Sequence, residues 1–106
     1  MSQAPPGYAD LHRLRNHPIG GDGRVYRPPV PGTLSLAVAR VIRDVADELY
    51  LSQTELGRRS GVPQSTISRA YQGRQAFTID QVAAICEALG ISFAGVVAEA
   101  QERLAR

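Results

Sequence analysis

The segment from Ser60 to Gly73, SGVPQSTISRAYQG, is rich in hydrogen-bonding side chains and poor in apolar ones. If it forms a helix, Ile67 and Ala70 lie on one side. The opposite side and its flanks carry Ser65, Thr66, Ser68, Arg69 and Gln72. Short hydroxyl and amide groups can pair with base edges, and an arginine fork suits guanine. A solvated helix face more often carries Glu and Lys, so the pattern favours contact with DNA, with a solvated face as the alternative.

Helical periodicity begins after Gly32. Apolar residues at spacings of three and four predict a helix over 34–50, and they are Leu34, Val38, Val41, Ile42, Val45 and Leu49. Ser52 followed by Glu55 is a capping-box pattern, which predicts a short helix over 53–59. The polar segment therefore follows two helices that can hold it in place.

Three further helices complete the chain. Pro63 suits a first helical turn and Gly73 a left-handed cap, so we expect a helix over 63–72. Hydroxyl caps predict two more, over 79–89 and 93–104. The capping residues are Thr78, paired with Gln81, and Ser92. No strand-like alternation occurs from residue 33 onward, which predicts an all-α, five-helix domain over 33–106.

Residues 1–32 hold six of the seven prolines and five of the ten glycines, which predicts a flexible basic arm. Four arginines in it are candidates for the minor groove, where arginine senses groove width. These are Arg13, Arg15, Arg24 and Arg27. An unstructured tail with incidental charge is the alternative, and docking of Tyr8, Leu11 and Leu14 on the domain or on a partner is a third.

Composition excludes several classes of protein. The single cysteine, Cys86, permits no internal disulfide, and no apolar run is long enough for a membrane span. We therefore expect a cytoplasmic protein, free in the host cytoplasm or associated with the nucleoid, with no membrane partner. All twelve basic residues are arginine, which a GC-rich genome would explain as well as DNA binding would.

Catalytic and ligand sites find little support in the sequence. His12 and His17 have no carboxylate or cysteine partner at metal spacing, and Cys86 falls on an apolar helix face. We expect no enzyme activity, no cofactor, no metal and no small-molecule ligand.

A short capped helix, the turn SGV and a second helix with a polar outer face form a helix-turn-helix arrangement. Here the sequence resembles the lambda-repressor-like, Cro/C1-type family. The resemblance spans about residues 33–98, through Ser-Gln at 52–53, Gly-Val at 61–62, Ser-Thr-Ile-Ser at 65–68 and Ala-Leu-Gly at 88–90. It implies a DNA-binding regulator whose third helix enters the major groove.

The resemblance also implies roles for individual residues. Base contacts fall on Gln64, Ser65 and Arg69, with Thr66 and Ser68 in support. Phosphate contacts fall on Gln53, Gln72, the amide of Gly73 and Arg74, and Gln53 can also brace Gln64. Arg58 is a further phosphate candidate, although it could simply cover the end of its own helix.

Three positions depart from the family pattern. Ala46 and Tyr71 stand where many members have an Arg–Glu ion pair, and we expect Tyr71 to pack over Ala46 instead. Gly57 replaces the usual alanine, which suggests close helix packing. Pro63 replaces the usual hydroxyl cap.

In the last helix we expect Phe93, Val96 and Val97 to complete the core. Ala100 and Leu104 are candidates for a two-fold homodimer contact. The polar helix and the family resemblance thus predict a sequence-specific repressor that binds double-stranded DNA, and the resemblance suggests the phage or mobile-element immunity type. An antitoxin-type autoregulator and a protein-interaction adaptor are the alternatives.

Overall fold

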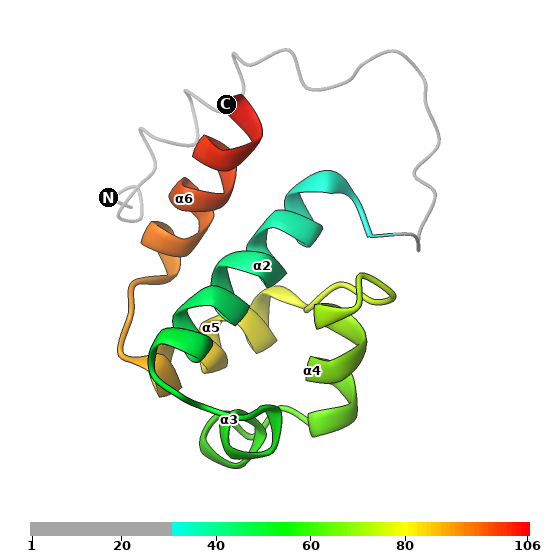
Figure 1. Cartoon of the computed structure of the whole chain (residues 1–106), viewed down its shortest axis with the longest axis vertical. Helices are drawn as coiled ribbons and strands as arrows, with labels where there is room; N and C mark the ends of the chain where they lie inside the picture. The colour runs from blue at the N-terminus through cyan, green and yellow to red at the C-terminus, as the bar shows by residue number, and fades with distance from the viewer. Residues whose placement is uncertain (1–30) are drawn as a thin grey trace, which may run out of the picture.

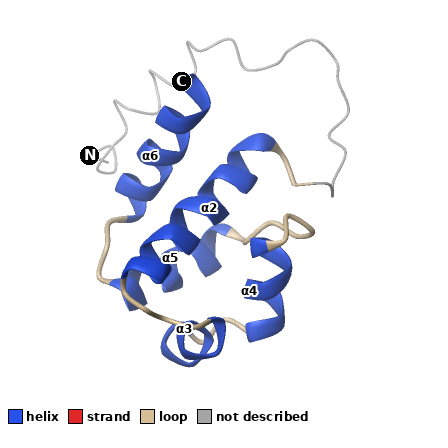
Figure 2. Ribbon diagram, viewed as in Figure 1, coloured by secondary structure: helices blue, strands red, loops and turns tan. Residues whose placement is uncertain are grey.

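The computed structural model describes residues 31–106, which fold into five α-helices without a strand (Figure 1). The helices are α2 (Thr33–Glu48), α3 (Gln53–Ser60), α4 (Gln64–Tyr71), α5 (Ile79–Leu89) and α6 (Phe93–Ala105). Short loops join them (Figure 2). The all-α, five-helix prediction is confirmed, and every helix end lies within two residues of the predicted position.

The predictions for the arm lie outside the described residues. They concern minor-groove contacts by Arg13, Arg15, Arg24 and Arg27, and docking of Tyr8, Leu11 and Leu14.

Local chemistry explains where α2 ends and α3 begins. Tyr50 has a φ of 57°, and this left-handed conformation stops α2 two residues before the predicted end at position 50. The Ser52 hydroxyl then accepts a hydrogen bond from the Glu55 amide at 3.1 Å. The Glu55 carboxylate does not complete the predicted capping box, because it accepts hydrogen bonds from Arg58 and Arg59 instead.

The later helix ends follow the sequence more closely. At α5 both halves of the capping box form, with Thr78 and Gln81 each bonding to the other's backbone amide at 3.0 Å. The Ser92 hydroxyl caps α6. Pro63 precedes α4 as its N-cap, with ψ at 136°, rather than forming its first turn as predicted.

Helix α2 runs through the middle of the domain, with α6 packed along it and α3 packed on both α4 and α5 (Figure 1). The side chains buried between them are Ala37, Val41, Ile42, Ala46, Leu56, Val62, Ile67, Val82, Ile85, Cys86, Leu89, Val96 and Ala100. Leu56 and Ile67 are both fully buried. Their burial fixes α3 and α4 on the rest of the domain.

The apolar side chains at one edge of the domain are not all covered. Ile79 is 74% exposed and Phe93 38% exposed, so the prediction that Phe93 completes the core is wrong. With Leu34 they line an apolar groove of about 250 Å³ between the first turns of α2, α5 and α6. The apolar faces of α2, α5 and α6 therefore extend beyond the region in which these helices cover one another.

An ion-pair network fixes α6 on α2. Arg103 donates to Asp44 on α2 at 2.7 Å and to Glu99 on its own helix at 3.1 Å. Ala100, on the same helix, is fully buried, so its side chain cannot form the predicted dimer contact. Leu104 is half exposed and remains a candidate contact.

Two further findings concern the described part of the chain. No group of three His, Cys, Asp or Glu side chains there could hold a metal ion. None of its single helices is long and apolar enough to cross a membrane, and α5 with α6 passes that test only as a pair bent by 108°.

Candidate nucleic-acid interface

The outer face of α4 is polar, as the sequence predicts. Gln64 and Ser65 are exposed at its first turn, and Ser68 and Arg69 are half-buried further along. Thr66, which was predicted to support base contacts, is only 6% exposed. Thr66 therefore supports the fold of α4 and does not belong to the outer face.

Close packing of α3 on the start of α4 sets the position of this face. A Cβ added at Gly57 would lie 3.0 Å from the Val62 carbonyl oxygen and 3.5 Å from the Gln64 amide nitrogen. The absent side chain therefore lets the two helices approach at the turn. This is the close packing that the glycine at position 57 suggests.

A pair of glutamines joins the N-terminal ends of α3 and α4. Gln64 Nε2 donates to Gln53 Oε1 at 3.3 Å, across eleven residues of sequence. The bracing of Gln64 by Gln53 that the family resemblance implies is thus present. Each amide keeps further donor and acceptor capacity, because one bond uses a single donor of Gln64 and one lone pair of Gln53.

A Schellman motif ends α4 at its other end. Gly73 adopts a left-handed φ of 76°, its amide donates to the Ala70 carbonyl at 3.1 Å, and the Arg74 amide donates to the Arg69 carbonyl at 2.9 Å. The chain turns at Gly73, and the Arg74 amide stays bonded to the last turn of α4. Gln75 is thereby brought beside Arg69.

Side-chain bonds link this loop to the polar face. The Gln72 side-chain amide donates to the Ser68 hydroxyl at 3.2 Å, and Arg74 Nη1 donates to Gln72 Oε1 at 3.2 Å. Arg69 Nε donates to Gln75 Oε1 at 2.7 Å. These hydrogen bonds therefore hold the polar side chains at the end of α4 in fixed positions relative to one another.

The charge of Arg69 and Arg74 is not offset by these partners. Both arginines bond to uncharged amides, and residues 61–79 contain no Asp or Glu. A neutral acceptor orders a guanidinium without cancelling its charge. This end of α4 therefore keeps a net positive charge next to the exposed polar face.

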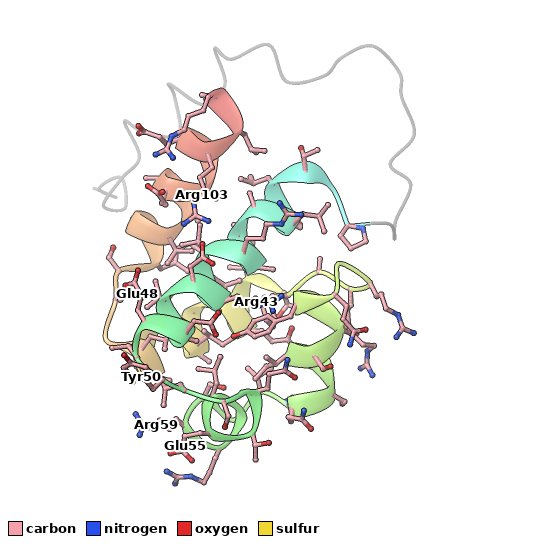
Figure 3. The ribbon with its side chains drawn as sticks, in the orientation of Figure 1. Arg43, Glu48, Tyr50, Glu55, Arg59 and Arg103 are labelled. Atoms are coloured by element: carbon pink, nitrogen blue, oxygen red, sulfur yellow. The ribbon has the colours of Figure 1, made fainter. Side chains whose placement is uncertain are left out.

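Arg58 and Arg59 on α3 lie in a different environment. Both donate to the Glu55 carboxylate, which Figure 3 shows beside Arg59 on α3. Hydrogen bonds from Arg58 and then from Arg59 lower the pKa of Glu55 to about 2. The charge of Arg58, a predicted phosphate ligand, is therefore already paired within the helix.

A cation–π contact involves Tyr71, one of the two positions at which the family often has an ion pair. The guanidinium of Arg43, labelled on α2 in Figure 3, lies over the Tyr71 ring, 5.7 Å from its centroid, and joins α2 to α4. Tyr71 packs against the core cluster to which Ala46 belongs, and its contact with Ala46 itself stays a prediction. Burial, and then the charge of Asp47, raise the pKa of Tyr71 to about 12.

The sequence interpretation missed two residues at this site, Arg43 and Gln75. Arg43 lies one turn before Ala46 on the same helix face, and this spacing could have indicated that Arg43 is within reach of Tyr71. Gln75 lies two residues after the glycine cap. A Schellman loop returns toward the last turn of its helix, but which side chain it approaches depends on the loop.

Comparison with known proteins identifies the fold. The family model of helix-turn-helix proteins matches residues 42–96, which is more than half of the chain. The chain belongs to the Cro/C1-type helix-turn-helix family. The family match and the regulator structure below support a DNA-binding transcriptional regulator. The match includes α3, the turn and α4.

Solved structures agree with this assignment. The chain is similar to the crystal structure of the clp gene regulator ClgR from Corynebacterium glutamicum, with 30% sequence identity and a TM-score of 0.64. The alignment covers 73% of this chain and 81% of that one. A mutant of a restriction-modification controller protein shares the fold at 20% identity, with a TM-score of 0.65 over 71% and 95%. The hypothetical transcription factor NHTF from Neisseria does so at 22% identity, with a TM-score of 0.58 over 77% and 93%.

A search of curated protein sequences finds no match to this helix-turn-helix protein.

Proposed function

We propose that this helix-turn-helix protein is a sequence-specific repressor that lays α4 in the major groove of double-stranded DNA. One observation supports this most strongly: the outer face of α4 exposes uncharged hydrogen-bonding groups, and its end carries arginines ordered by neutral amides. Such groups can pair with base edges without repelling phosphate.

The proposal assigns base contacts to the outer face. Gln64 offers a donor and an acceptor suited to adenine, and Arg69 a fork suited to guanine O6 and N7. Ser65 is exposed beside them, and Ser68 supports the face through its bond with Gln72. A bidentate contact of this kind discriminates against the wrong base by about 1–3 kcal/mol.

Phosphate contacts are assigned to the two ends of the face. Gln53 adjoins Gln64 at one end, and Gln72 and Arg74 lie at the other. The amide of Gly73, the remaining predicted phosphate donor, already donates to the Ala70 carbonyl at 3.1 Å. Contacts at both ends of a recognition helix fix its register on the duplex without reading sequence. Arg58 contributes to this set only after it separates from Glu55.

Repression requires only that the bound protein block a promoter. A small module gains useful affinity from a second copy or from an ordered arm. Leu104 is the remaining predicted dimer contact, and the arm arginines are the remaining minor-groove candidates. An immunity-type repressor and an antitoxin autoregulator share this DNA-binding step.

Selection of bound sequences from a random duplex library tests the proposal. We expect one enriched motif, palindromic for a dimer and asymmetric for a monomer. Arg69→Ala should relax one base position, and Arg74→Ala should weaken all duplexes alike and reduce the salt slope by about 0.9. Arg106→Ala, the same change of charge far from α4, is the control. No enriched motif at moderate salt would favour a protein-interaction adaptor, in which α4 or the arm binds another protein.

A further inference from the structure

We propose that Gln75, outside the recognition helix, is a specificity-determining residue that positions the Arg69 guanidinium for base reading. The inference rests on the proposed function, because it concerns how Arg69 would meet its base. Its physical basis is the 2.7 Å bond from Arg69 Nε to Gln75 Oε1, which is partly buried.

The bond uses the part of Arg69 that base reading does not need. Guanine is recognised through two parallel donors, and the terminal nitrogens Nη1 and Nη2 can supply them. With Nε held by Gln75, the terminal edge of the guanidinium keeps its donors. A bond to a terminal nitrogen would instead have occupied that edge.

The backbone makes this arrangement independent of DNA. Gly73 turns the chain left-handed, and the Arg74 amide is bonded to the carbonyl of Arg69 itself. Gln75 therefore approaches Arg69 from a loop that is anchored to the same residue. The side chain of Arg69 is ordered before a duplex arrives, which lowers the entropic cost of the contact.

The neutral partner also accounts for the choice of glutamine. Glu55 shows what a carboxylate does on α3, where it pairs the charge of Arg58 and Arg59. An amide at position 75 provides the acceptor and leaves the positive charge of Arg69 available. Gln75→Glu should therefore keep the base preference of the protein and lower its affinity for every duplex, since a negative charge is added beside phosphate.

The test compares base preference in Gln75→Leu, Gln75→Glu and the control Gln101→Leu, which makes the same chemical change on an exposed part of α6. We expect Gln75→Leu to reduce discrimination about three- to ten-fold at the one position that Arg69→Ala relaxes. Gln101→Leu should change nothing. Arg69→Ala added to Gln75→Leu should cost less discrimination than it does in the wild-type background, because both act on one contact.

A second readout needs no DNA. In the free protein the Arg69 Nε–H should give a resolved, slowly exchanging NMR signal that is lost in Gln75→Leu and kept in Gln75→Glu. Absence of this signal in the wild type would overturn the inference while leaving the proposed function intact. A uniform loss of affinity for all sequences in Gln75→Leu, or a gain of base discrimination, would overturn it as well. If the wild type selects no motif at all, the proposed function fails first and takes the inference with it.

Discussion

Gly73→Ala tests how the end of α4 is built. Gly73 holds a φ of +76°, and a Cβ there would lie 3.2 Å from Leu36 Cδ2. The left-handed conformation costs an L-residue about 1–2 kcal/mol. The Leu36 methyl group is the end of a flexible, half-buried side chain, so it can move by a few tenths of an ångström at little cost. We therefore expect Gly73→Ala to reduce the free energy of unfolding by about 1–2 kcal/mol.

Thermal unfolding followed by circular dichroism measures this loss. In a domain of this size each kcal/mol lowers Tm by about 4–8 °C, so the expected decrease is about 4–16 °C. Affinity for all duplexes should fall as well, because the turn at Gly73 positions Gln72 and Arg74, the proposed phosphate contacts.

Two further Gly→Ala variants serve as controls. Gly90 is left-handed at +69° with no atom within 4 Å of an added Cβ, so Gly90→Ala measures the backbone strain alone. Gly95 lies in the first turn of α6, where alanine has the higher helix propensity, and Gly95→Ala should raise stability by up to about 1 kcal/mol. If Gly73→Ala were as stable as the wild type while Gly90→Ala lost stability, the Schellman geometry assigned to the end of α4 would be refuted.

Three other predictions concern charge, ionisation and strain. Burial raises the pKa of Tyr71 from its ordinary 10.0 to about 12, so its contribution to stability is complete below pH 10 and is lost as the pH rises toward 12. Ultraviolet titration should show a late phenol ionisation that Tyr71→Phe removes. Glu55→Gln should free Arg58 and Arg59, raise affinity for non-specific duplex and steepen the salt slope by about one to two. An unchanged slope would mean that neither arginine reaches phosphate. Tyr50 is 95% exposed at a φ of 57°, so Tyr50→Asn should raise the free energy of unfolding by up to about 1 kcal/mol in chemical denaturation. A loss of stability would indicate that the Tyr50 side chain contributes to the fold.

Local signals in the sequence were sufficient for most helix ends. Thr78 with Gln81 forms both bonds of a capping box, and Gly73 takes the left-handed cap, because each uses atoms within a few residues. Tyr50 was missed because a tyrosine carries no preference for the left-handed region. The surrounding chain imposes that conformation on it: the Leu51 amide donates to the Ala46 carbonyl.

Burial depended on where helices cross, which periodicity does not encode. The apolar stripe of α6 includes Phe93, Val96, Ala100 and Leu104, yet only Val96 and Ala100 among these are buried, since α2 covers that part of the helix. The pair Arg103–Asp44 spans 59 residues and follows from the same crossing. Neither the exposed Phe93 nor the buried Ala100 could be assigned before the crossing was known.

The polar face of α4 was determined by the sequence alone, because helical geometry and two buried apolar residues, Ile67 and Ala70, decide which side is turned outward. The tertiary structure decided how that face is held. Gln53 meets Gln64, and Gln75 meets Arg69, through a turn and a loop whose paths depend on packing. Side-chain hydrogen bonds are short and directional, so they form only after the backbone has brought donor and acceptor within about 3 Å.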